Sequence, residues 1–584
     1  SARPTPRDAR RRTWLDLPGT RRAPHNCYHS SLGLYTIITV TPVLEWLRGR
    51  AASRTRHVDV IITSTAFRRA AFHLRRPLAA AAGCATSAAL AAYVASPTTC
   101  EPAKSNTLSA VNVIERAREL WIEVEQRELA DSLVNWSDPD SAYIDALKSL
   151  RSSYDMPAAT MQGLKDYFLS EATKGLAGEE SSLRMLPTYV DRRVTGNEKG
   201  DFYALDLGGT NFRVLRLTLL GNGKVGPVTQ GKFKIPKEIK ESDAEGLFGF
   251  LADSVATFLA TKCGGNPTGA LGFTFSFPTV QDSLNSGKLI VWNKEFTADG
   301  CVGEDVVKLL QTQFDKRGIA LEVKALANDT VGTMEAAAYK YPQTAMGVIL
   351  GTGTNAAYIE KTSKVGKWGG KASEEHVINT EWGNLDMASV MTVYDAGIDL
   401  ASQNPTLQRF EKMISGMYLG ELCRTSILSP EVLPAFSDEF KSSLQSTFGE
   451  RMSLPTSLMS AIESDSSPRL VAAAEALSEA GLPRSTVRYR VLLREACVCI
   501  STRAARLSAV GIVSLLEQMG EGKEGATIAI DGTVFECYPY FKERMEFGVE
   551  LLVGRENAKG IDLILAKDGS GVGSAIIAAI AASQ

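Results

Sequence analysis

The chain is 584 residues long, 44% hydrophobic and 22% charged, with a formal net charge of −2. Such values are ordinary for a globular protein of two or three domains, and a nearly neutral chain gives no reason to expect a nucleic-acid partner. Only one of its 5 histidines, His376, follows His73, which excludes a multi-histidine metal site. The 9 cysteines include no C-x-x-C pairs at zinc spacing, which indicates structural thiols in a reducing compartment.

The first 105 residues differ in composition from the rest, because they are rich in arginine and poor in acids. This composition is typical of organelle transit peptides. Residues 78–95 form an Ala-rich, weakly apolar run at the lower limit for a membrane-spanning helix. We therefore expect a targeting or anchoring leader, which would associate the protein with an organelle membrane (plastid or mitochondrion) or leave it in the cytosol. The alternative is a disordered leader, or a segment that is not part of the mature protein.

From residue 106 the sequence is typical of a folded chain, with an N-terminal region over 106–342 and a C-terminal region over 343–584. Helical periodicity predicts helices at 111–133 and 161–177. After Gly200, short apolar runs, glycine-rich turns and helical stretches alternate, which favours α/β layers. The Ser-rich, Pro-containing stretch 436–468 is expected to be the loosest part of the chain.

Residues 346–360, MGVILGTGTNAAYIE, contain a G-x-G-x-x-A string behind an apolar run. This string matches the fingerprint of a dinucleotide-binding turn, which also needs a helix directly after the glycines. Here the turn is followed by β-favouring residues and then by three glycines up to Gly370, which make a poor helix and a reasonable strand. The glycine loop is therefore predicted to join two strands of a β-hairpin.

A second hairpin of the same kind is predicted at residues 202–217, FYALDLGGTNFRVLRL. In its second strand, period 2 puts Leu215 and Leu217 on one face and Phe212 and Val214 on the other. Two Asp-Gly-[Ser/Thr] turns, at 531–533 and 568–570, follow further apolar runs. Glycine lets backbone N–H groups approach an anion, and Thr or Ser adds a hydroxyl donor. Together the turns predict a nucleotide triphosphate held between two hairpins.

These turns belong to a set of strings that resembles the hexokinases, of the actin-like sugar-kinase superfamily, over residues 106–582. The strings are LDLGGTNFRV (205–214), LGFTFSFP (271–278), ALANDTVGT (325–333), ILGTGTNAAYIE (349–360), INTEWGN (378–384), FEKMISGMYLGE (410–421) and DGSG (568–571). The strings are similar to those of eukaryotic hexokinases of plant or algal type. The resemblance implies an α/β, two-lobed RNase H-like (actin-like ATPase) fold with a cleft between a small and a large domain. It also implies phosphorylation of the 6-hydroxyl of glucose and related hexoses with ATP and Mg²⁺.

By this resemblance Asp329 takes the proton of the acceptor hydroxyl during phosphoryl transfer, and Lys294 supplies positive charge beside the phosphoryl group. The local sequence leaves a second role open for Asp329, because Asn-Asp-Thr before a helix is also good N-cap chemistry. Each sugar hydroxyl both donates and accepts, so a sugar site needs converging acids and amides. The implied sugar-binding residues are Ser276, Asn293, Lys294, Asn328, Asp329, Asn355, Glu381 and Glu411.

Several of these residues have ordinary structural roles if the resemblance is set aside. Ser276 would be a hydrogen-bonded hydroxyl at a strand end, and Lys294 a surface lysine. Glu411 would be a first-turn glutamate that interacts with the helix dipole. The apolar face of its predicted helix consists of Phe410, Met413, Ile414 and Met417.

On the nucleotide side, Asp206 occupies the position where the superfamily places a carboxylate near hydrated Mg²⁺. The resemblance assigns the first phosphate hairpin to Gly208, Gly209, Thr210, Asn211 and Arg213, and the second to Gly353 and Thr354. It places Asp531, Gly532 and Thr533 near the α-phosphate, and Gly569 and Ser570 near the adenosine.

One segment departs from the family pattern. Where the family usually has Trp-Thr-Lys-Gly-Phe, residues 292–296 read Trp-Asn-Lys-Glu-Phe. Asn293 keeps a hydrogen-bonding side chain with a different reach, and Glu295 adds a negative charge, so we expect weaker sugar affinity or a changed hexose preference. A catalytically impaired, sugar-sensing protein is therefore an alternative. An actin- or chaperone-like ATPase is another, although it would have no use for the sugar-binding strings.

Overall fold

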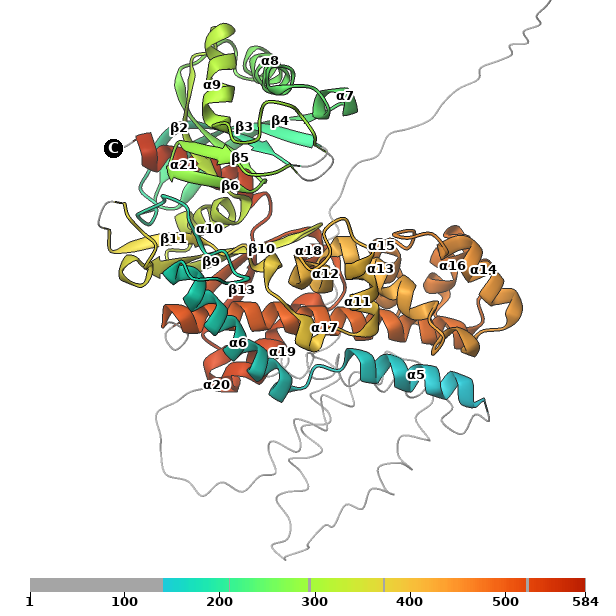
Figure 1. The fold of residues 1–584 in the computed structure, drawn as a ribbon. Helices are drawn as coiled ribbons and strands as arrows, with labels where there is room; N and C mark the ends of the chain where they lie inside the picture. Colours follow the sequence, from blue (N-terminus) through green and yellow to red (C-terminus); the bar gives the residue numbers. More distant parts are fainter. Residues whose placement is uncertain (1–139, 209–210, 293–295, 371–372, 521–524, 583–584) are drawn as a thin grey trace, which may run out of the picture. The chain divides into compact units, whose positions relative to one another are not determined.

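The structure is a computed structural model that describes residues 140–208, 211–292, 296–370, 373–520 and 525–582 (Figure 1). The leader, the predicted helix at 111–133 and the predicted site residues Gly209, Thr210, Asn293 and Lys294 lie outside the described residues. The predicted helix at 161–177 is confirmed, since α6 spans Ala158–Ala177.

The first of two large sheets has five strands in the order β4-β3-β2-β5-β8. Strands β2 (Lys199–Leu207), β3 (Asn211–Gly221) and β4 (Lys224–Lys234) are antiparallel, and β5 (Gly269–Phe275) and β8 (Leu321–Ala327) run parallel to β2. Phe212 and Val214 of β3 are buried in one core with α8 (Ala244–Lys262) and α9 (Val306–Lys316), whereas Leu215 and Leu217 face a second core. The predicted two faces of this strand are confirmed.

The second large sheet has six strands in the order β1-β11-β10-β9-β12-β13. The predicted hairpin at 346–360 is confirmed, because β9 and β10 pair antiparallel across the glycine turn. Strands β12 and β13 run parallel to β9. The strands are β1 (Leu186–Pro187), β9 (Thr344–Leu350), β10 (Thr354–Lys361), β11 (Glu375–Asn379), β12 (Ala526–Asp531) and β13 (Ile561–Leu565).

The two large sheets thus share one arrangement. In each, an antiparallel set of strands begins with a glycine-turn hairpin, and two more strands run parallel to the first strand of that hairpin. This duplicated arrangement is the two-lobed RNase H-like fold of the actin-like ATPases. A separate small hairpin, β6 (Thr279–Ser283) with β7 (Ser286–Leu289), follows β5.

Two helices that cross each other join the sheets. Helix α10 (Asp329–Lys340) packs on β9 of the six-stranded sheet, and α21 (Gly569–Ala582) packs on β2 and β5 of the other (Figure 1). At their crossing a Cβ on Gly573 would lie 1.7 Å from the carbonyl oxygen of Gly332. Only glycine permits this approach of two helix backbones.

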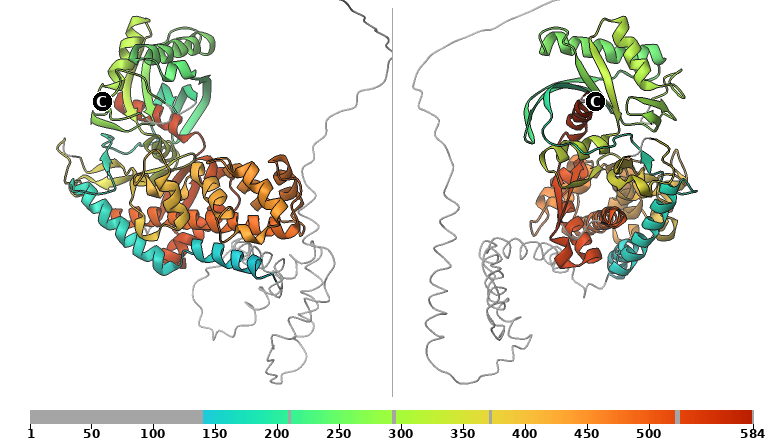
Figure 2. Two further views of the ribbon diagram at one scale, coloured as in Figure 1. Left: turned by 45° about the vertical axis from the view of Figure 1, so that its right-hand side comes forward. Right: turned by 90° about the vertical axis from the view of Figure 1, so that its left-hand side faces the viewer.

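The six-stranded sheet is extended by a helical layer around α17 (Val487–Met519), which runs through its centre (Figure 2). Among the described residues only this helix is long and apolar enough to cross a membrane, and most of its residues are buried in the core. Its N-terminal partners α5 (Ser141–Tyr154) and α6 pack directly on it. The other helices of this layer are α11 (Val393–Leu400), α12 (Arg409–Ile414), α13 (Gly416–Ile427), α14 (Asp438–Phe448), α15 (Thr456–Ser464), α16 (Val471–Glu479), α18 (Thr533–Cys537), α19 (Phe541–Val553) and α20 (Arg555–Ala558); the four-residue α7 (Lys237–Lys240) precedes α8.

The stretch 436–468, expected to be the loosest part of the chain, instead contains helices α14 and α15. That expectation was wrong because Ser437 caps α14 by accepting the Phe440 N–H, and Pro455 precedes the first residue of α15. Residue 342, where the two regions of the chain were divided, lies between α10 and β9. Each region contributes a helix to the other's sheet, since α10 packs on β9 and α21 packs on β2.

Candidate active site

Asp329 lies at the junction of β8 and α10. Asn328 is the N-cap of α10, because its Oδ1 accepts the Thr330 N–H at 2.9 Å and the Thr330 hydroxyl at 2.6 Å. The N-cap position that the local sequence left open for Asp329 is therefore held by its neighbour, although Asp329 Oδ1 also accepts the Thr330 N–H, at 3.0 Å. Asp329 occupies the first helical position, half-buried, where the helix dipole stabilises a negative charge. Its Oδ2 accepts the Ser276 hydroxyl, 3.3 Å away at the end of β5.

A cluster of amides and one acid adjoins this junction. The amide nitrogen of Asn355 on β10 donates to Asn379 Oδ1 at 2.9 Å, and lies 3.4 Å from both Asn328 Oδ1 and Glu381 Oε1. Asn379 in turn donates to Glu381 Oε1 at 2.9 Å. Glu381 has a φ of 51°, a strained conformation of the kind that gathers at binding sites. Three predicted sugar residues, Asn328, Asn355 and Glu381, are thus brought together.

Asn379 is a member of this cluster that the sequence analysis missed. It ends β11 two residues before Glu381 and is buried. Its place in INTEWGN, as an amide two residues before the predicted sugar acid, was a signal that could have identified it.

Glu411 lies on α12, beside the turn between β9 and β10. Its Oε2 accepts the Thr354 N–H at 3.0 Å, and a Cβ on Gly353 would lie 2.6 Å from the same oxygen. The sugar glutamate and the second phosphate turn, predicted separately, are therefore in direct contact. The predicted apolar face is confirmed for Phe410, Met413 and Ile414 but wrong for Met417, which lies after the helix break at Ser415 and is 51% exposed.

A cavity of about 440 Å³ opens beside the amide cluster. Asn328, Asn379 and Glu381 are among its polar lining residues, and Phe275, Phe277 and Trp368 are among its apolar ones. A cavity of this size, lined by aromatic rings and by converging polar groups, is typical of a small-molecule site.

The predicted nucleotide residues Asp206, Arg213 and Ser570 form a second cluster, between β2–β3 and the start of α21. Arg213 donates to Asp206 Oδ2 through Nη2 at 2.6 Å and Nε at 3.1 Å, and also pairs with Asp568. Ser570 donates to the same Asp206 oxygen at 3.1 Å. Asp206 is only 7% exposed, so an organised carboxylate lies at the end of β2, directly before the first glycine turn.

Asp531 ends β12 and Gly532 follows it, at the same end of the six-stranded sheet as the β9–β10 turn. Gly532 has a φ of 125°, and a Cβ there would lie 2.3 Å from the carbonyl oxygen of Leu350, so the two turns touch through backbone alone. Burial, with a contribution from the negative charge of Asp568, raises the pKa of Asp531 to about 6. Thr533 begins α18, and Gly569 begins α21.

The remaining predicted residues are described only in part. Gly208 directly follows β2 and Asn211 begins β3, although the side chain of Asn211 is not described. Residues 293–295 are bracketed by Trp292 and Phe296, whose rings stack with centroids 5.3 Å apart. No group of three or more His, Cys, Asp or Glu side chains that could hold a metal ion by itself is found in the part of the chain that the structure describes.

Two RNase H-like lobes, an aspartate at a helix start beside converging amides, and glycine turns at the strand ends define a phosphotransferase of the actin-like ATPase class. Sequence profiles described as Hexokinase match residues 146–339 and 345–580. The chain belongs to the hexokinase family. It is 42% identical over 453 residues to Hexokinase-1 of Spinacia oleracea, covering 74% of this chain and 90% of that protein. It is also 42% identical over 446 residues to Hexokinase-7 of Oryza sativa subsp. japonica, covering 74% and 96%.

A solved structure of a hexokinase from Schistosoma mansoni, complexed with glucose, superimposes with a TM-score of 0.68 at 35% identity. The match covers 78% of this chain and 99% of the other. The chain is thus similar to plant hexokinases in sequence and to an animal hexokinase in fold.

Proposed function

We propose that this protein transfers the γ-phosphoryl group of ATP to the 6-hydroxyl of glucose and related hexoses. The observation that carries the proposal is the contact of Asp329 with Ser276 next to the Asn328–Asn355–Glu381 cluster. Two members of that cluster, Asn328 and Glu381, line the cavity. The family to which the chain belongs and the glucose complex of the similar Schistosoma hexokinase support the same acceptor.

In this proposal the amides and acids hold the sugar. Asn328, Asn355 and Glu381 present both donors and acceptors, which sugar hydroxyls require. Asp329 takes the proton of the 6-hydroxyl as that oxygen attacks phosphorus, and Ser276 holds the Asp329 carboxylate through its hydroxyl. Lys294, from the segment outside the described residues, supplies positive charge beside the phosphoryl group.

The nucleotide side fits a magnesium-bound triphosphate in the chemistry of its donors. Mg²⁺ prefers carboxylate and water oxygens and usually keeps several waters, and Asp206 provides a carboxylate held in place by Arg213 and Ser570. The β9–β10 turn and Gly532 meet without side chains, so that a phosphate can approach the backbone closely here. When bound, the metal neutralises phosphate charge. Contacts of Asp531 and Thr533 with the α-phosphate, and of Gly569 and Ser570 with the adenosine, belong to this proposal.

The two lobes provide a means to exclude water. Water is a smaller acceptor than a sugar, so a site that is complete only after sugar has drawn the lobes together suppresses hydrolysis of ATP. The amide cluster draws on both lobes, because Asn328 follows β8 whereas Asn355 lies on β10 and Glu381 follows β11.

The proposal is tested by a coupled assay on the full chain with ATP and several hexoses. In this assay an added dehydrogenase oxidises the sugar 6-phosphate, and the reduction of NADP⁺ is measured. We expect turnover with glucose that requires both ATP and Mg²⁺. Binding of glucose without turnover would overturn the proposal and favour a sugar-sensing protein, the alternative that the departures at Asn293 and Glu295 support.

We also propose that the Arg-rich leader directs the protein to an organelle. Its composition supports this, with no lysine among the first 100 residues. Fractionation of cells that express a full-length, C-terminally tagged chain tests it, and an exclusively cytosolic tag would contradict it.

A further inference from the structure

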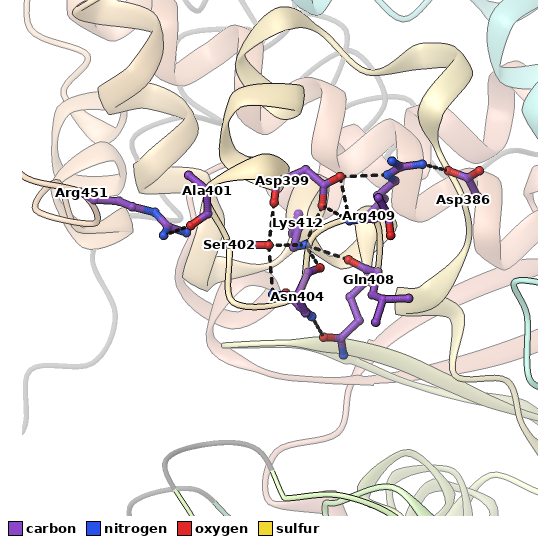
Figure 3. Close-up of polar contacts among 11 residues, drawn as sticks. Asp386, Asp399, Ala401, Ser402, Asn404, Gln408, Arg409, Lys412 and Arg451 are labelled. Atoms are coloured by element: carbon purple, nitrogen blue, oxygen red, sulfur yellow. Dashed lines mark hydrogen bonds and ion pairs between the residues drawn. The ribbon is translucent and has the colours of Figure 1, made fainter.

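A buried ion pair joins α11 to α12 (Figure 3). Lys412 is 3% exposed and Asp399 is 2% exposed, and the lysine Nζ lies 2.7 Å from Asp399 Oδ1. The same ammonium group donates to Ser402 Oγ and to the carbonyl oxygens of Asn404 and Leu407, each at 2.8 Å. A buried charge is tolerated only when it is paired and fully hydrogen-bonded, and this site meets both conditions.

Asp399 also holds the segment between α11 and α12, residues 401–408, through its own hydrogen bonds. Its two oxygens accept the Thr406 N–H at 3.1 Å, and Oδ2 accepts Arg409 Nε at 3.0 Å. Arg409 also reaches Asp386 at 2.6 Å. Although burial alone would raise it, these hydrogen bonds and the Lys412 charge hold the pKa of Asp399 below its usual value. The carboxylate is therefore ionised at neutral pH.

Helix α12 depends on these contacts more than most helices would. It is six residues long, and its N-cap residue, Gln408, has a φ of 51° and makes no capping side-chain hydrogen bond. Short helices without caps have little stability of their own. Since Arg409 and Lys412 flank Glu411 on this helix, the ion pair fixes the direction in which Glu411 leaves the backbone.

The position of α12 also sets the second phosphate turn. Glu411 accepts the Thr354 N–H, and just after α12 the N–H groups of Gly416 and Met417 donate to the carbonyl oxygens of Gly351 (2.8 Å) and Thr352 (3.2 Å). A shift of α12 would therefore move a sugar ligand and a nucleotide turn together.

We propose that Lys412 and Asp399 are positioning residues for sugar recognition: their buried pair holds α12 so that Glu411 reaches the sugar site and braces the turn at 351–354. The inference rests on the proposed role of Glu411 as a sugar ligand. Neither Lys412 nor Asp399 is placed against substrate.

The test compares Lys412→Gln and Ser402→Ala with the wild-type full chain by calorimetric glucose binding and by steady-state kinetics. We expect Lys412→Gln to raise the glucose Kd and KM at least tenfold, and to raise the KM for ATP because the turn at 351–354 shifts with α12. At saturating glucose and ATP, kcat should stay within about threefold of the wild type. Ser402→Ala, which removes one of four acceptors, is expected to raise the glucose Kd and KM by about threefold. Lys441→Gln is the matched control, because Lys441 pairs with the fully exposed Asp438 at 3.1 Å on α14, and no change is expected there.

A folded Lys412→Gln protein with unchanged glucose Kd would overturn the inference. A second result would also overturn it: a fall in apparent kcat that is fully explained by a smaller folded fraction, while the folded fraction binds glucose with the wild-type Kd. That result would mean that Lys412 serves only the stability of the fold. If Lys412→Gln does not fold, Ser402→Ala decides, and an unchanged Kd there counts against the inference. The ratio of the variant's glucose Kd to the wild-type Kd can be measured without turnover. If the wild-type chain binds glucose but does not phosphorylate it, the proposed function is refuted, and this inference is still decided by the Kd ratio.

Discussion

The hydroxyl of Ser276 lies 3.3 Å from Oδ2 of Asp329 and so joins the end of β5 to the start of α10. The two residues are 53 positions apart in the chain, and the parallel pairing of β5 with β8 brings them together. This contact holds the proposed base at the edge of the five-stranded sheet, on the helix that packs against the six-stranded one.

We predict that Asp329→Asn lowers kcat by two to four orders of magnitude, the usual contribution of a general base. Glucose affinity should change by less than tenfold, because the amide keeps the shape of the side chain and an oxygen that accepts the Thr330 N–H, while Asn328 remains the N-cap. Coupled kinetics and calorimetric glucose binding measure the two effects. Near-normal turnover in this variant would refute the assignment of the base.

A second prediction concerns the departure from the family pattern. Asn293→Thr should lower the apparent KM for glucose, because it restores the hydroxyl that the family pattern carries at this position. The measurement is steady-state kinetics with glucose varied at saturating ATP. An unchanged or higher KM would count against a sugar-binding role for residue 293, and Asn285→Thr, in the exposed β6–β7 turn, serves as the control.

A third prediction concerns the helix crossing. Gly573→Ala should destabilise the protein by about 1–3 kcal/mol, because the added methyl group would overlap the carbonyl oxygen of Gly332. Denaturant unfolding measures this loss. Gly163→Ala is the control, since this exposed glycine of α6 has no neighbouring atoms within 4 Å of an added Cβ; there we expect stabilisation by about 0.5–1 kcal/mol through helix propensity. Equal effects at the two glycines would contradict the close crossing.

A fourth prediction follows from Glu335, which is fully buried on α10. Burial raises its pKa from 4.5 to about 8, although the Val194 N–H and the charge of Arg193 oppose this. The native state therefore binds a proton that the unfolded state has released, and stability falls as pH rises. The contribution is fully present below about pH 4.5 and is lost progressively up to about pH 8.

Glu335→Gln removes this dependence, so its stability relative to the wild type should increase between pH 5 and pH 8, by at most about 1.4 kcal/mol per pH unit. Unfolding of both proteins across this range checks the slope. Glu475→Gln, on the exposed side of α16, should show a constant difference. A constant difference for Glu335→Gln as well would show that Glu335 is ionised in the folded protein.

The sequence predicted the sheets and the site well where the signal was local. Both glycine-turn hairpins, the two faces of β3, and the strand-to-helix position of Asp329 followed from period and turn chemistry. Asn328, Asn355 and Glu381 were singled out by the family strings, and the structure shows that they touch.

What the sequence did not reveal depends on contacts between distant segments. The pairing of Arg213 with Asp568 spans 355 positions, and nothing near either residue signals it. The break that exposes Met417 is made by bonds from Gly416 and Met417 to the turn at 351–352, which override a continuous helical pattern. The helices at 436–468 were missed because serine and proline are as common at helix starts as in loops.

The frame around residues 293–295 is closed on both sides. The Trp292 ring stacks on Phe296, its indole N–H donates to the Ala298 carbonyl oxygen at 2.9 Å, and Phe277 packs edge-on against both rings. Trp292 and Phe296 are therefore held in place by contacts with each other and with the core behind them. Hexose preference could thus evolve, or be engineered, through single substitutions at residues 293–295 while Trp292 and Phe296 keep their places in the core.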